Sequence, residues 1–541
     1  MNVASAVKQT SVCTVSDPIS EAKRRRTFAI ISHPDAGKTT LTEKFLLYGG
    51  ALAKEAGSVK AREGRRSATS DWMELEQQRG ISITSTVLQF EYRDCIINLL
   101  DTPGHRDFSE DTYRVLVAAD AAVMVLDAAK GIEPQTLKLF EVCREREIPF
   151  MTFINKWDRP GKSPLELLDE LEDTLVVEPT PVTWPVGIAG EFKGVIHQDT
   201  GEYTQFERTT RGSTIAPELL VSAEDAFAEH GEDWTTAKDE SDLLKELGRT
   251  VDIESFLEGA STPVFFGSAL TNFGVKFLLD GVVDLVPPPE ARLLADGNTR
   301  PLDDPFCGLV FKVQAGMDKS HRDRIAFVRV CSGIFERGLT AIAERSEKQF
   351  STKFAQTMFG QDRTTADTAY PGDVIGLVNA TDLCIGDAVY VKKPASFPTL
   401  PEFAPEHFMR ARAKDTSKFK QFRKGIQQLD EEGAIQVLRD DTFGDQAPIL
   451  AAVGPMQFEV ASYRLENEFG AQIELTATKF TIARKTNEAS MKKLKAMQGV
   501  DVMERNGGYL ALFESKYWMD RVISDHPDLT LERMVAEGGL G

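Results

Sequence analysis

The sequence predicts a multidomain protein: an α/β domain with a phosphate-binding loop and an insertion, then a β-barrel domain, then an α+β sandwich domain. Three observations predict this order. Near the N-terminus, an apolar run leads through a tight turn into a helix with apolar residues at helical spacing. Short β-type runs between Gly and Asp turns follow in the middle of the chain. Helical and β-like stretches then alternate from Pro401 onward.

The domain boundaries are placed where the composition changes. With 541 residues, the chain is too long for a single hydrophobic core. About a hundred residues separate two of the expected strands of the α/β domain, more than one βα unit needs, so we expect an insertion. The expected divisions are a disordered leader at 1–22, the α/β domain at 23–289 with its insertion at about 160–260, a proline-marked linker at 290–304, the barrel at 305–398 and the α+β domain at 399–541.

Composition and charge exclude several classes of protein. The 63 basic and 83 acidic residues give a net charge of −20, so any contact with RNA must be local, and we expect no DNA partner. The six cysteines lie far apart without a CxxC pair, which argues against zinc and disulfide frameworks and fits a cytoplasmic protein. No apolar run approaches the roughly 18 residues of a membrane span, so we expect no membrane partner.

The phosphate-binding loop is predicted between the strand Phe28–Ile31 and a helix opened by Lys38. In this context the backbone N–H groups and the positive helix end face a polyphosphate, Lys38 reaches its outer phosphates, and the Thr39 hydroxyl binds Mg²⁺. Ser32 stands where the consensus has Gly, and the stretch alone also fits a surface turn with a solvated lysine. The predicted phosphate-binding residues are Ser32, His33, Pro34, Asp35, Ala36, Gly37, Lys38, Thr39 and Thr40.

A second motif, DTPGH, follows a strand predicted at Cys95–Leu100. A carboxylate at the carboxyl end of a buried strand can hold Mg²⁺ through water, and the unhindered N–H of Gly104 can bond the terminal phosphate. The predicted residues are Asp101, Thr102, Pro103, Gly104 and His105.

Two further strand ends are predicted to read the base. A carboxylate at Asp158 can accept two hydrogen bonds from the ring N–H and the amine of guanine, whereas adenine presents an acceptor at the ring position. The segment after the strand Thr262–Phe266 suits backbone contact with the guanine oxygen. The predicted residues are Asn155, Lys156, Trp157, Asp158, Ser268, Ala269 and Leu270.

The four motifs together are more specific than any one of them. Each lies at the carboxyl end of a predicted strand and they come in the required order, where open α/β sheets bind ligands. The sequence therefore predicts a P-loop GTPase domain that binds GTP and GDP.

The amino-acid sequences of the motifs resemble those of a known family. The segments SHPDAGKTT, RGISIT, DTPGH and NKWD resemble the translation-factor GTPases, the class that includes elongation factors G and Tu. Longer stretches, such as ISHPDAGKTTLTEKFLLYGGA and NLLDTPGHRDFSEDTYR, resemble the bacterial release-factor GTPases, and the likeness covers nearly everything after residue 22. Elongation factor G carries additional domains that mimic a transfer RNA, for which this chain has no room.

The resemblance implies a function and site roles. It implies a ribosome-stimulated GTPase of translation termination that promotes dissociation and recycling of the stop-codon-reading release factors. Its partners would be the ribosome, through RNA and proteins, and those release factors. His105 would orient the attacking water, alongside Lys38 as a second catalytic residue. The implied Mg²⁺ ligands are Thr39, Ser82 and Asp101, although the superfamily has Thr where this chain has Ser82.

Several alternatives stay open at this point. His105 also fits a surface histidine that caps the following helix. The chain also fits a ribosome-protection factor that displaces a bound drug, or a GTP-binding switch without useful hydrolysis. Residues 410–424, with seven basic residues, one Asp, and Phe419 and Phe422 between them, fit a contact with ribosomal RNA or a solvated helix face. The basic cluster Lys23–Arg26 is a second candidate for RNA contact.

Overall fold

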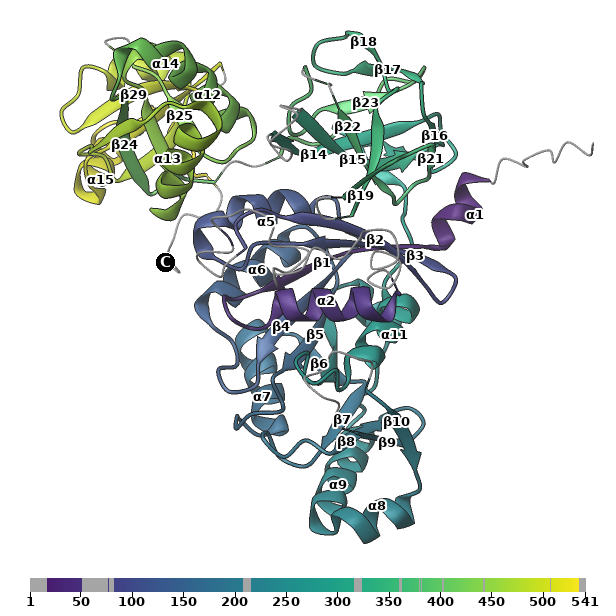
Figure 1. Ribbon diagram of the computed structural model, residues 1–541. Coiled ribbons are helices and arrows are strands. Elements are labelled where there is room, and N and C mark those ends of the chain that lie inside the picture. Colours follow the sequence, from purple (N-terminus) through teal and green to yellow (C-terminus); the bar gives the residue numbers. More distant parts are fainter. Residues whose placement is uncertain are drawn as a thin grey trace, which may run out of the picture.

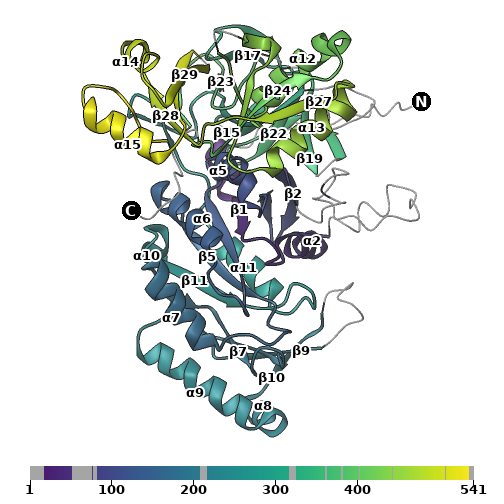
Figure 2. The same ribbon diagram turned by 90° about the vertical axis from the view of Figure 1, so that its left-hand side faces the viewer.

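The computed structural model has the three expected domains, and the sheet of the first domain lies at the centre of the molecule (Figure 1). The GTPase domain lies in the middle, its insertion extends to one end, and the barrel and the C-terminal domain lie side by side at the other end (Figures 1 and 2). The structure describes residues 17–50, 76, 82–207, 216–315, 324–359, 362–378, 380, 382–400, 403–440, 443–505 and 507–534.

The central sheet has seven strands in the order β2-β3-β1-β4-β5-β11-β6. All neighbours pair in parallel except β2 and β3, which form an antiparallel hairpin. The carboxyl ends of β1, β3, β4, β5 and β11 therefore share one edge, where ligands bind in such sheets. The strands are β1 (Arg25–Ser32), β2 (Thr86–Tyr92), β3 (Cys95–Asp101), β4 (Ala121–Asp127), β5 (Phe150–Asn155), β6 (Glu178–Pro181) and β11 (Ser261–Phe266).

Helices cover both faces of this sheet because its strands are apolar on both faces. Along β1, Phe28 and Ile30 enter one hydrophobic core, and Ala29 and Ile31 enter the other, as successive strand residues point to opposite faces. The first core includes α2 (Lys38–Tyr48) and α11 (Val275–Leu285). The second includes α5 (Ser109–Leu116), preceded by the 3₁₀ turn η1 (Arg106–Phe108), α6 (Pro134–Glu145) and α7 (Pro164–Leu175).

The insertion forms a small unit of its own, and part of it completes the central sheet. Its four strands pair in the order β10-β9-β8-β7. Residues 178–181, which we expected within the insertion, instead form β6 and pair with β11 in the main sheet. The remaining elements are β7 (Thr183–Val186), β8 (Gly194–His197), β9 (Tyr203–Phe206), β10 (Glu218–Val221), α8 (Ala223–His230), α9 (Glu232–Glu246) and α10 (Ile253–Leu257).

Two segments are more ordered than the sequence predicted. Helix α1 (Pro18–Lys23) lies within the expected leader, because Asp17 caps it and Pro18 starts it, and it buries Ala22. The disordered leader was therefore wrong for residues 18–22, and residues 1–16 lie outside the described residues. The expected linker contains the hairpin of β12 (Arg292–Leu293) and β13 (Thr299–Arg300). It packs on the barrel because Arg300 is fully buried and donates to the Ser332 hydroxyl at 2.8 Å.

The second domain is a β-barrel, as predicted. Its main sheet has eight strands in the order β18-β17-β23-β14-β15-β22-β19-β20, around an apolar core. The strands of this domain are β14 (Cys307–Ala315), β15 (Arg324–Ser332), β16 (Phe335–Glu336), β17 (Thr340–Ala343), β18 (Gln349–Ser351), β19 (Ala355–Phe359), β20 (Asp362–Thr365), β21 (Thr368–Ala369), β22 (Val374–Val378) and β23 (Ala388–Tyr390).

The C-terminal domain has the predicted α+β composition. Helices α12 (Phe419–Glu431) and α13 (Met456–Phe469) cover a four-stranded sheet, and a three-stranded sheet with two shorter helices follows. The first sheet is β24 (His407–Ala413), β25 (Gln436–Leu438), β26 (Ile449–Ala452) and β27 (Ile473–Ala477). The second part consists of β28 (Ile482–Thr486), α14 (Glu488–Leu494), β29 (Val500–Arg505), β30 (Gly508–Phe513) and α15 (Lys516–Asp525).

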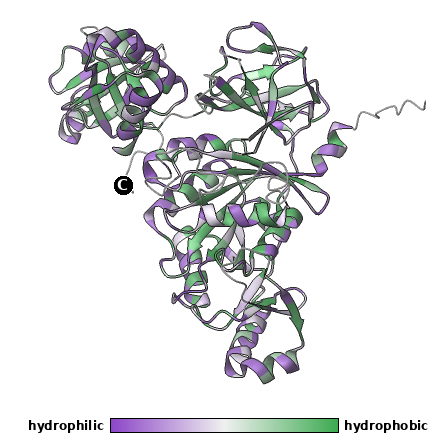
Figure 3. Cartoon of the chain, in the orientation of Figure 1, coloured by the Kyte–Doolittle hydropathy of each residue, from purple (hydrophilic) through white to green (hydrophobic). Residues whose placement is uncertain are grey.

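Hydrophobic residues follow the strands of the central sheet and the barrel, whereas the helices carry many hydrophilic residues (Figure 3). Among the described residues, none of the helices combines the length and the apolar character needed to cross a membrane. The five cysteines that the structure describes are all free thiols.

Candidate guanine-nucleotide site

The loop between β1 and α2 has the conformation of a phosphate-binding turn. Asp35 and Gly37 both adopt positive φ, at 64° and 98°. A Cβ on Gly37 would lie 2.3 Å from the Asn155 Nδ2, so only glycine fits this position. Lys38 begins α2, so the turn and the positive end of this helix lie at the same edge of the sheet. The nine residues predicted to bind phosphate therefore run from the end of β1 through this turn into the first turn of α2.

The residues predicted to bind Mg²⁺ gather around Lys38. Its ammonium lies 2.6 Å from the Asp101 Oδ1, and both side chains are buried. The Ser82 hydroxyl lies 3.4 Å from the Lys38 Nζ and 3.5 Å from the Thr39 Oγ1. Two hydroxyls and a carboxylate are hard oxygen donors of the kind that Mg²⁺ takes alongside substrate phosphates, so this donor set fits the ion. Among the described residues there is no cluster of three acidic, His or Cys side chains that could hold a metal alone.

The DTPGH segment lies directly against the phosphate-binding loop. The Thr102 hydroxyl donates to the carbonyl of Ile30 at 2.6 Å, which ties the segment to β1. A Cβ on Gly104 would lie 3.5 Å from the carbonyl oxygens of Ser32 and His33. The backbone at Gly104 thus passes close to the loop, as expected for an N–H that bonds the terminal phosphate.

His105 follows at the edge of the site. Its ring is partly exposed, with 31% of the side chain accessible. Nδ1 lies 3.3 Å from the backbone N of Asp107 and 3.4 Å from its Oδ1, so the ring caps the turn η1. The capping role that we considered from the sequence is thus present in this conformation, and the catalytic role of His105 stays a prediction.

The predicted base-reading residues converge from two strand ends. Asn155 donates to the Ala36 carbonyl at 2.7 Å and accepts from the Ala269 N–H at 2.9 Å, so it joins three loops. The Asp158 carboxylate accepts a hydrogen bond from the Ser268 hydroxyl at 2.5 Å. These contacts place the Asp158 carboxylate next to the loop that was expected to contact the guanine oxygen.

The remaining members of this set differ in how they lie. The Lys156 ammonium is 2.8 Å from the Asp127 carboxylate, and although burial opposes ionisation, this contact helps hold the pKa of Asp127 below its ordinary value. Trp157 is fully buried and packs edge-on against Phe266, with ring centroids 5.1 Å apart. Its side chain therefore supports the loop from the core and does not line the nucleotide edge. Leu270 is half exposed, which suits a contribution through its backbone.

Sequence reasoning missed two acidic partners of the site. His33 is almost fully buried, and its Nδ1 lies 2.5 Å from the Glu133 carboxylate. Burial lowers the pKa of His33 despite that carboxylate. Glu76 is buried as well and accepts from the backbone N–H groups of Ile83 and Thr84 at 2.9 and 3.0 Å, which fixes the segment after Ser82. The sequence signal for Glu133 was weak: it directly precedes the helix-starting Pro134.

Only part of the basic cluster Lys23–Arg26 faces solvent: Lys23 and Arg24 are exposed, whereas Arg25 is buried. Arg25 is buried, lies 2.7 Å from Glu21 and 2.8 Å from Asp373 of the barrel, and stacks over Tyr370. This guanidinium therefore joins two domains, and Arg25 is removed from the RNA candidate, which stays a prediction for Lys23 and Arg24.

The 410–424 segment keeps its charges at the surface but not its aromatic rings. Phe422 is fully buried and Phe419 packs against the same core, because both lie on the inner face of α12. They are not available to stack on bases. Six of the seven basic residues are exposed: Arg412, Lys414, Lys418, Lys420, Arg423 and Lys424.

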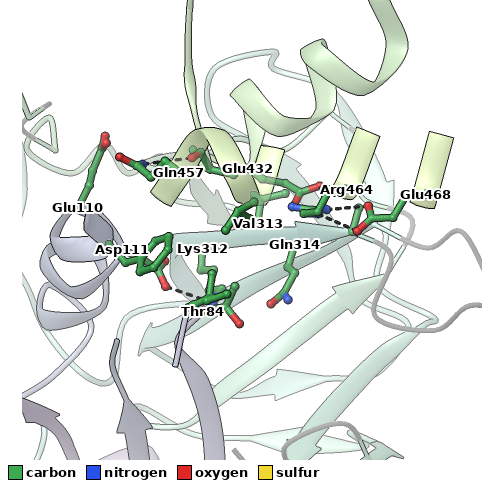
Figure 4. A pocket seen from close by; sticks show the side chains of 16 residues that line it. Thr84, Glu110, Asp111, Lys312, Val313, Gln314, Glu432, Gln457, Arg464 and Glu468 are labelled. Carbon is green, nitrogen blue, oxygen red and sulfur yellow. Dashed lines mark hydrogen bonds and ion pairs between the residues drawn. The ribbon is translucent and has the colours of Figure 1, made fainter. Parts of the chain in front are cut away.

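All three domains meet beside the segment that follows Ser82. There, residues of α5, β14, α13 and the turn after α12 line a cavity of about 60 Å³ (Figure 4). The Lys312 ammonium is fully buried and donates to the Ser85 carbonyl and hydroxyl at 2.6 and 2.7 Å. Asp111 accepts from the Ser85 N–H at 2.7 Å and lies 3.5 Å from Lys312. Burial lowers the pKa of Lys312, and the contact with Asp111 opposes that shift.

The comparisons with known families follow the same three-domain order. Models described as the Elongation factor Tu GTP binding domain, Elongation factor G domain 2, and the Class II release factor RF3 C-terminal domain match residues 23–288, 305–392 and 397–523. The Peptide chain release factor 3 of Trichodesmium erythraeum (strain IMS101) is 49% identical over 514 residues, which cover 94% of this chain and 95% of that protein. The chain belongs to the peptide chain release factor 3 family.

Other relatives agree with this membership. The release factor 3 of Synechococcus elongatus is 49% identical over 537 residues, covering 98% of this chain and 96% of that protein. A crystal structure from Thermus thermophilus has a TM-score of 0.67 at 24% identity and covers 90% of this chain and 72% of that one, which shows the shared fold. As a member of the release factor 3 family, the protein is a GTPase of translation termination whose first domain binds GTP and GDP.

Proposed function

We propose that this release factor 3 protein hydrolyses GTP on the ribosome during termination and thereby promotes dissociation and recycling of the stop-codon-reading release factors. One observation carries the mechanical part of the proposal: the barrel residue Lys312 binds the backbone of Ser85, three residues after Ser82. A change at the terminal phosphate that moves the Ser82 segment therefore pulls directly on another domain. The proposal also implies a cytoplasmic location.

We assign the Mg²⁺ of the nucleotide to Thr39, Ser82 and Asp101. Thr39 and Ser82 would offer hydroxyl oxygens, and Asp101 would act through water. When bound, the ion would neutralise negative charge on the outer phosphates. Ser82 lacks the methyl group of the Thr found in the superfamily, so its hydroxyl is less restricted in rotation. Its position beside Thr39 supports a ligand role despite that difference.

The hydrolysis step rests on His105 and Lys38. Phosphoryl transfer requires positioning and stabilisation of charge more than covalent chemistry by the protein. Lys38 supplies a buried positive charge at the outer phosphates, and the backbone at Gly104 supplies an N–H. His105 would orient the attacking water through Nε2 while its Nδ1 accepts from the Asp107 N–H over η1. Intrinsic turnover is therefore slow, and the ribosome completes the site.

The outer face of α12 is the surface that we assign to ribosomal RNA. Lys420, Arg423 and Lys424 recur at helical spacing on the side opposite Phe422 and are exposed. The first turn of α12 contains no acidic residue and Lys418 stands at its N-cap, so basic side chains add to the positive end of the helix dipole. A concentration of positive charge on a chain of net charge −20 fits a local contact with phosphates.

The experiment measures GTP hydrolysis with and without ribosomes and follows release-factor dissociation from a stop-codon complex in the same samples. Ribosome-dependent hydrolysis together with faster dissociation is the expected result. Hydrolysis without faster dissociation would contradict the termination role and place the protein at another step, such as ribosome protection. No stimulation by ribosomes would contradict the GTPase mechanism and leave a nucleotide-dependent switch.

A further inference from the structure

The segment after His105 is held by the C-terminal domain at one buried carboxylate. Asp107 is only 5% exposed and lies in η1, two residues from His105. Its Oδ2 accepts a hydrogen bond from the backbone N of Met456 at 2.7 Å. Met456 is the first residue of α13, so the contact joins the DTPGH segment to a helix that lies 349 residues further along the chain.

The C-terminal domain is shaped to receive this carboxylate. Helix α13 has no side-chain cap of its own, and Asp107 supplies an acceptor and a negative charge at its N-terminus. A Cβ on Gly454 would lie 2.0 to 2.4 Å from the carboxyl atoms of Asp107, so any larger residue there would displace the carboxylate.

Asp107 serves two different partners. Its Oδ2 accepts from the C-terminal domain, whereas its backbone N–H donates to the Nδ1 of His105 at 3.3 Å. We propose that Asp107 is a positioning residue through which the placement of the C-terminal domain sets the orientation of the His105 ring. This inference rests on the proposed function, in which His105 orients the attacking water.

The physical reason lies in the two ring nitrogens of His105. Nδ1 accepts a hydrogen bond from the Asp107 N–H at 3.3 Å, so the ring proton lies on Nε2, and Nε2–H is the group that meets a water molecule. When the C-terminal domain moves, Asp107 loses the Met456 N–H and η1 shifts, so the Asp107 N–H that anchors the His105 ring shifts with it. The position of the C-terminal domain thereby determines whether His105 is oriented for hydrolysis.

Neighbouring interdomain contacts lack this connection to His105. Arg106 pairs with Glu406 of the C-terminal domain at 2.5 Å, but its side chain is half exposed. Arg114 donates to the Gly433 carbonyl at 3.3 Å from the far end of α5. Both side chains hold the domains together, and neither is recorded in a hydrogen bond or an ion pair with the His105 side chain. A variant of one of these contacts therefore distinguishes the loss of a docking contact from the loss of the positioning role.

The test uses the full-length protein with ribosomes that carry a stop codon. Asp107→Ala removes the carboxylate that accepts from the Met456 N–H and keeps the backbone N–H that donates to His105 Nδ1. Gly454→Ala displaces the carboxylate from the C-terminal side without altering the nucleotide site. Arg106→Ala is the control that removes a docking contact. For each protein, ribosome-stimulated kcat, KM for GTP, binding of a fluorescent GTP analogue and Tm are measured, with His105→Ala alongside.

We expect Asp107→Ala and Gly454→Ala to lower ribosome-stimulated kcat by roughly tenfold to a hundredfold, with KM and GTP binding close to the unaltered protein. Arg106→Ala should keep its kcat. Unaltered kcat in Asp107→Ala, or an equal loss in Arg106→Ala, would overturn the positioning role. Unaltered kcat in His105→Ala would instead overturn the proposed function, and the two failures are thus distinguishable.

Discussion

The Asn155 side chain donates a hydrogen bond to the carbonyl of Ala36 across 2.7 Å and so joins the base-reading loop to the phosphate-binding loop. Its carbonyl oxygen accepts from the Ala269 N–H at 2.9 Å, which adds the third loop of the site. All three residues are buried, so each of these polar groups depends on the others for a partner.

The first prediction concerns this connection. Asn155→Ala leaves the Ala36 carbonyl and the Ala269 N–H without partners, at about 1 to 3 kcal/mol for each buried group. We expect the Kd for GDP to rise by roughly tenfold to a hundredfold in a fluorescence titration. Asn467→Ala, at an exposed position on α13, is the control. An unchanged Kd in Asn155→Ala would show that the loops hold their places without this side chain.

The second prediction concerns His105. We expect His105→Ala to bind GTP almost normally and to lose roughly two or more orders of magnitude in ribosome-stimulated hydrolysis, because the ring acts on the attacking water and not on the bound nucleotide. Single-turnover hydrolysis on ribosomes measures the effect. Near-normal turnover in this variant would remove His105 from the mechanism.

The third prediction concerns pH. Burial lowers the pKa of His33 below its ordinary value of 6.5 in the folded protein. Below that pH the unfolded chain takes up more protons than the folded chain, so stability is lost as the pH falls through 6.5, by at most about 1.4 kcal/mol per pH unit.

Thermal unfolding of the nucleotide-free protein at pH of about 7.5 and about 5.5 measures this effect. We expect the Tm of the unaltered protein to fall more on acidification than the Tm of His33→Gln. His407→Gln, which changes an exposed histidine, should behave like the unaltered protein. Identical pH dependence in His33→Gln would contradict the assignment to His33.

The fourth prediction concerns the α12 surface. We expect Lys420→Gln together with Lys424→Gln to weaken ribosome binding by roughly tenfold and to reduce the slope of log affinity against log salt by about one to two. The matched control is Lys479→Gln with Lys492→Gln, which removes the same charge from exposed lysines elsewhere in the same domain. An equal loss of ribosome binding in the control would show that the effect comes from net charge and not from the α12 surface.

Much of the nucleotide site could be predicted because its signals are local. The strand before Lys38, the strand that ends at Asp101 and the strand that ends at Asn155 each show as short apolar runs followed by a motif. Parallel pairing then brings those ends to one edge without further information. The helical spacing of the apolar residues would also have placed Phe422 in the core, because it shares a helix face with Ile426 and Leu429.

The parts that could not be predicted depend on contacts between residues far apart in sequence. Arg25 looked like one of four surface bases, but it is buried against Asp373, 348 residues away. Lys312 carried no motif, and only the packing of the barrel on the GTPase domain brings it to Ser85. The expected linker packs because Arg300 finds buried partners in the barrel, which no local pattern indicates.

The most direct test of the central claim couples base reading to release-factor dissociation. Asp158→Asn should reject GTP and accept xanthosine triphosphate, whose exocyclic oxygen suits an amide donor. A labelled release factor on a stop-codon ribosome is followed with this variant and either nucleotide. We predict rapid dissociation with xanthosine triphosphate and slow dissociation with GTP. Equal dissociation with both nucleotides, or with neither, while the unaltered protein remains active with GTP, would contradict control of termination by nucleotide bound at this site.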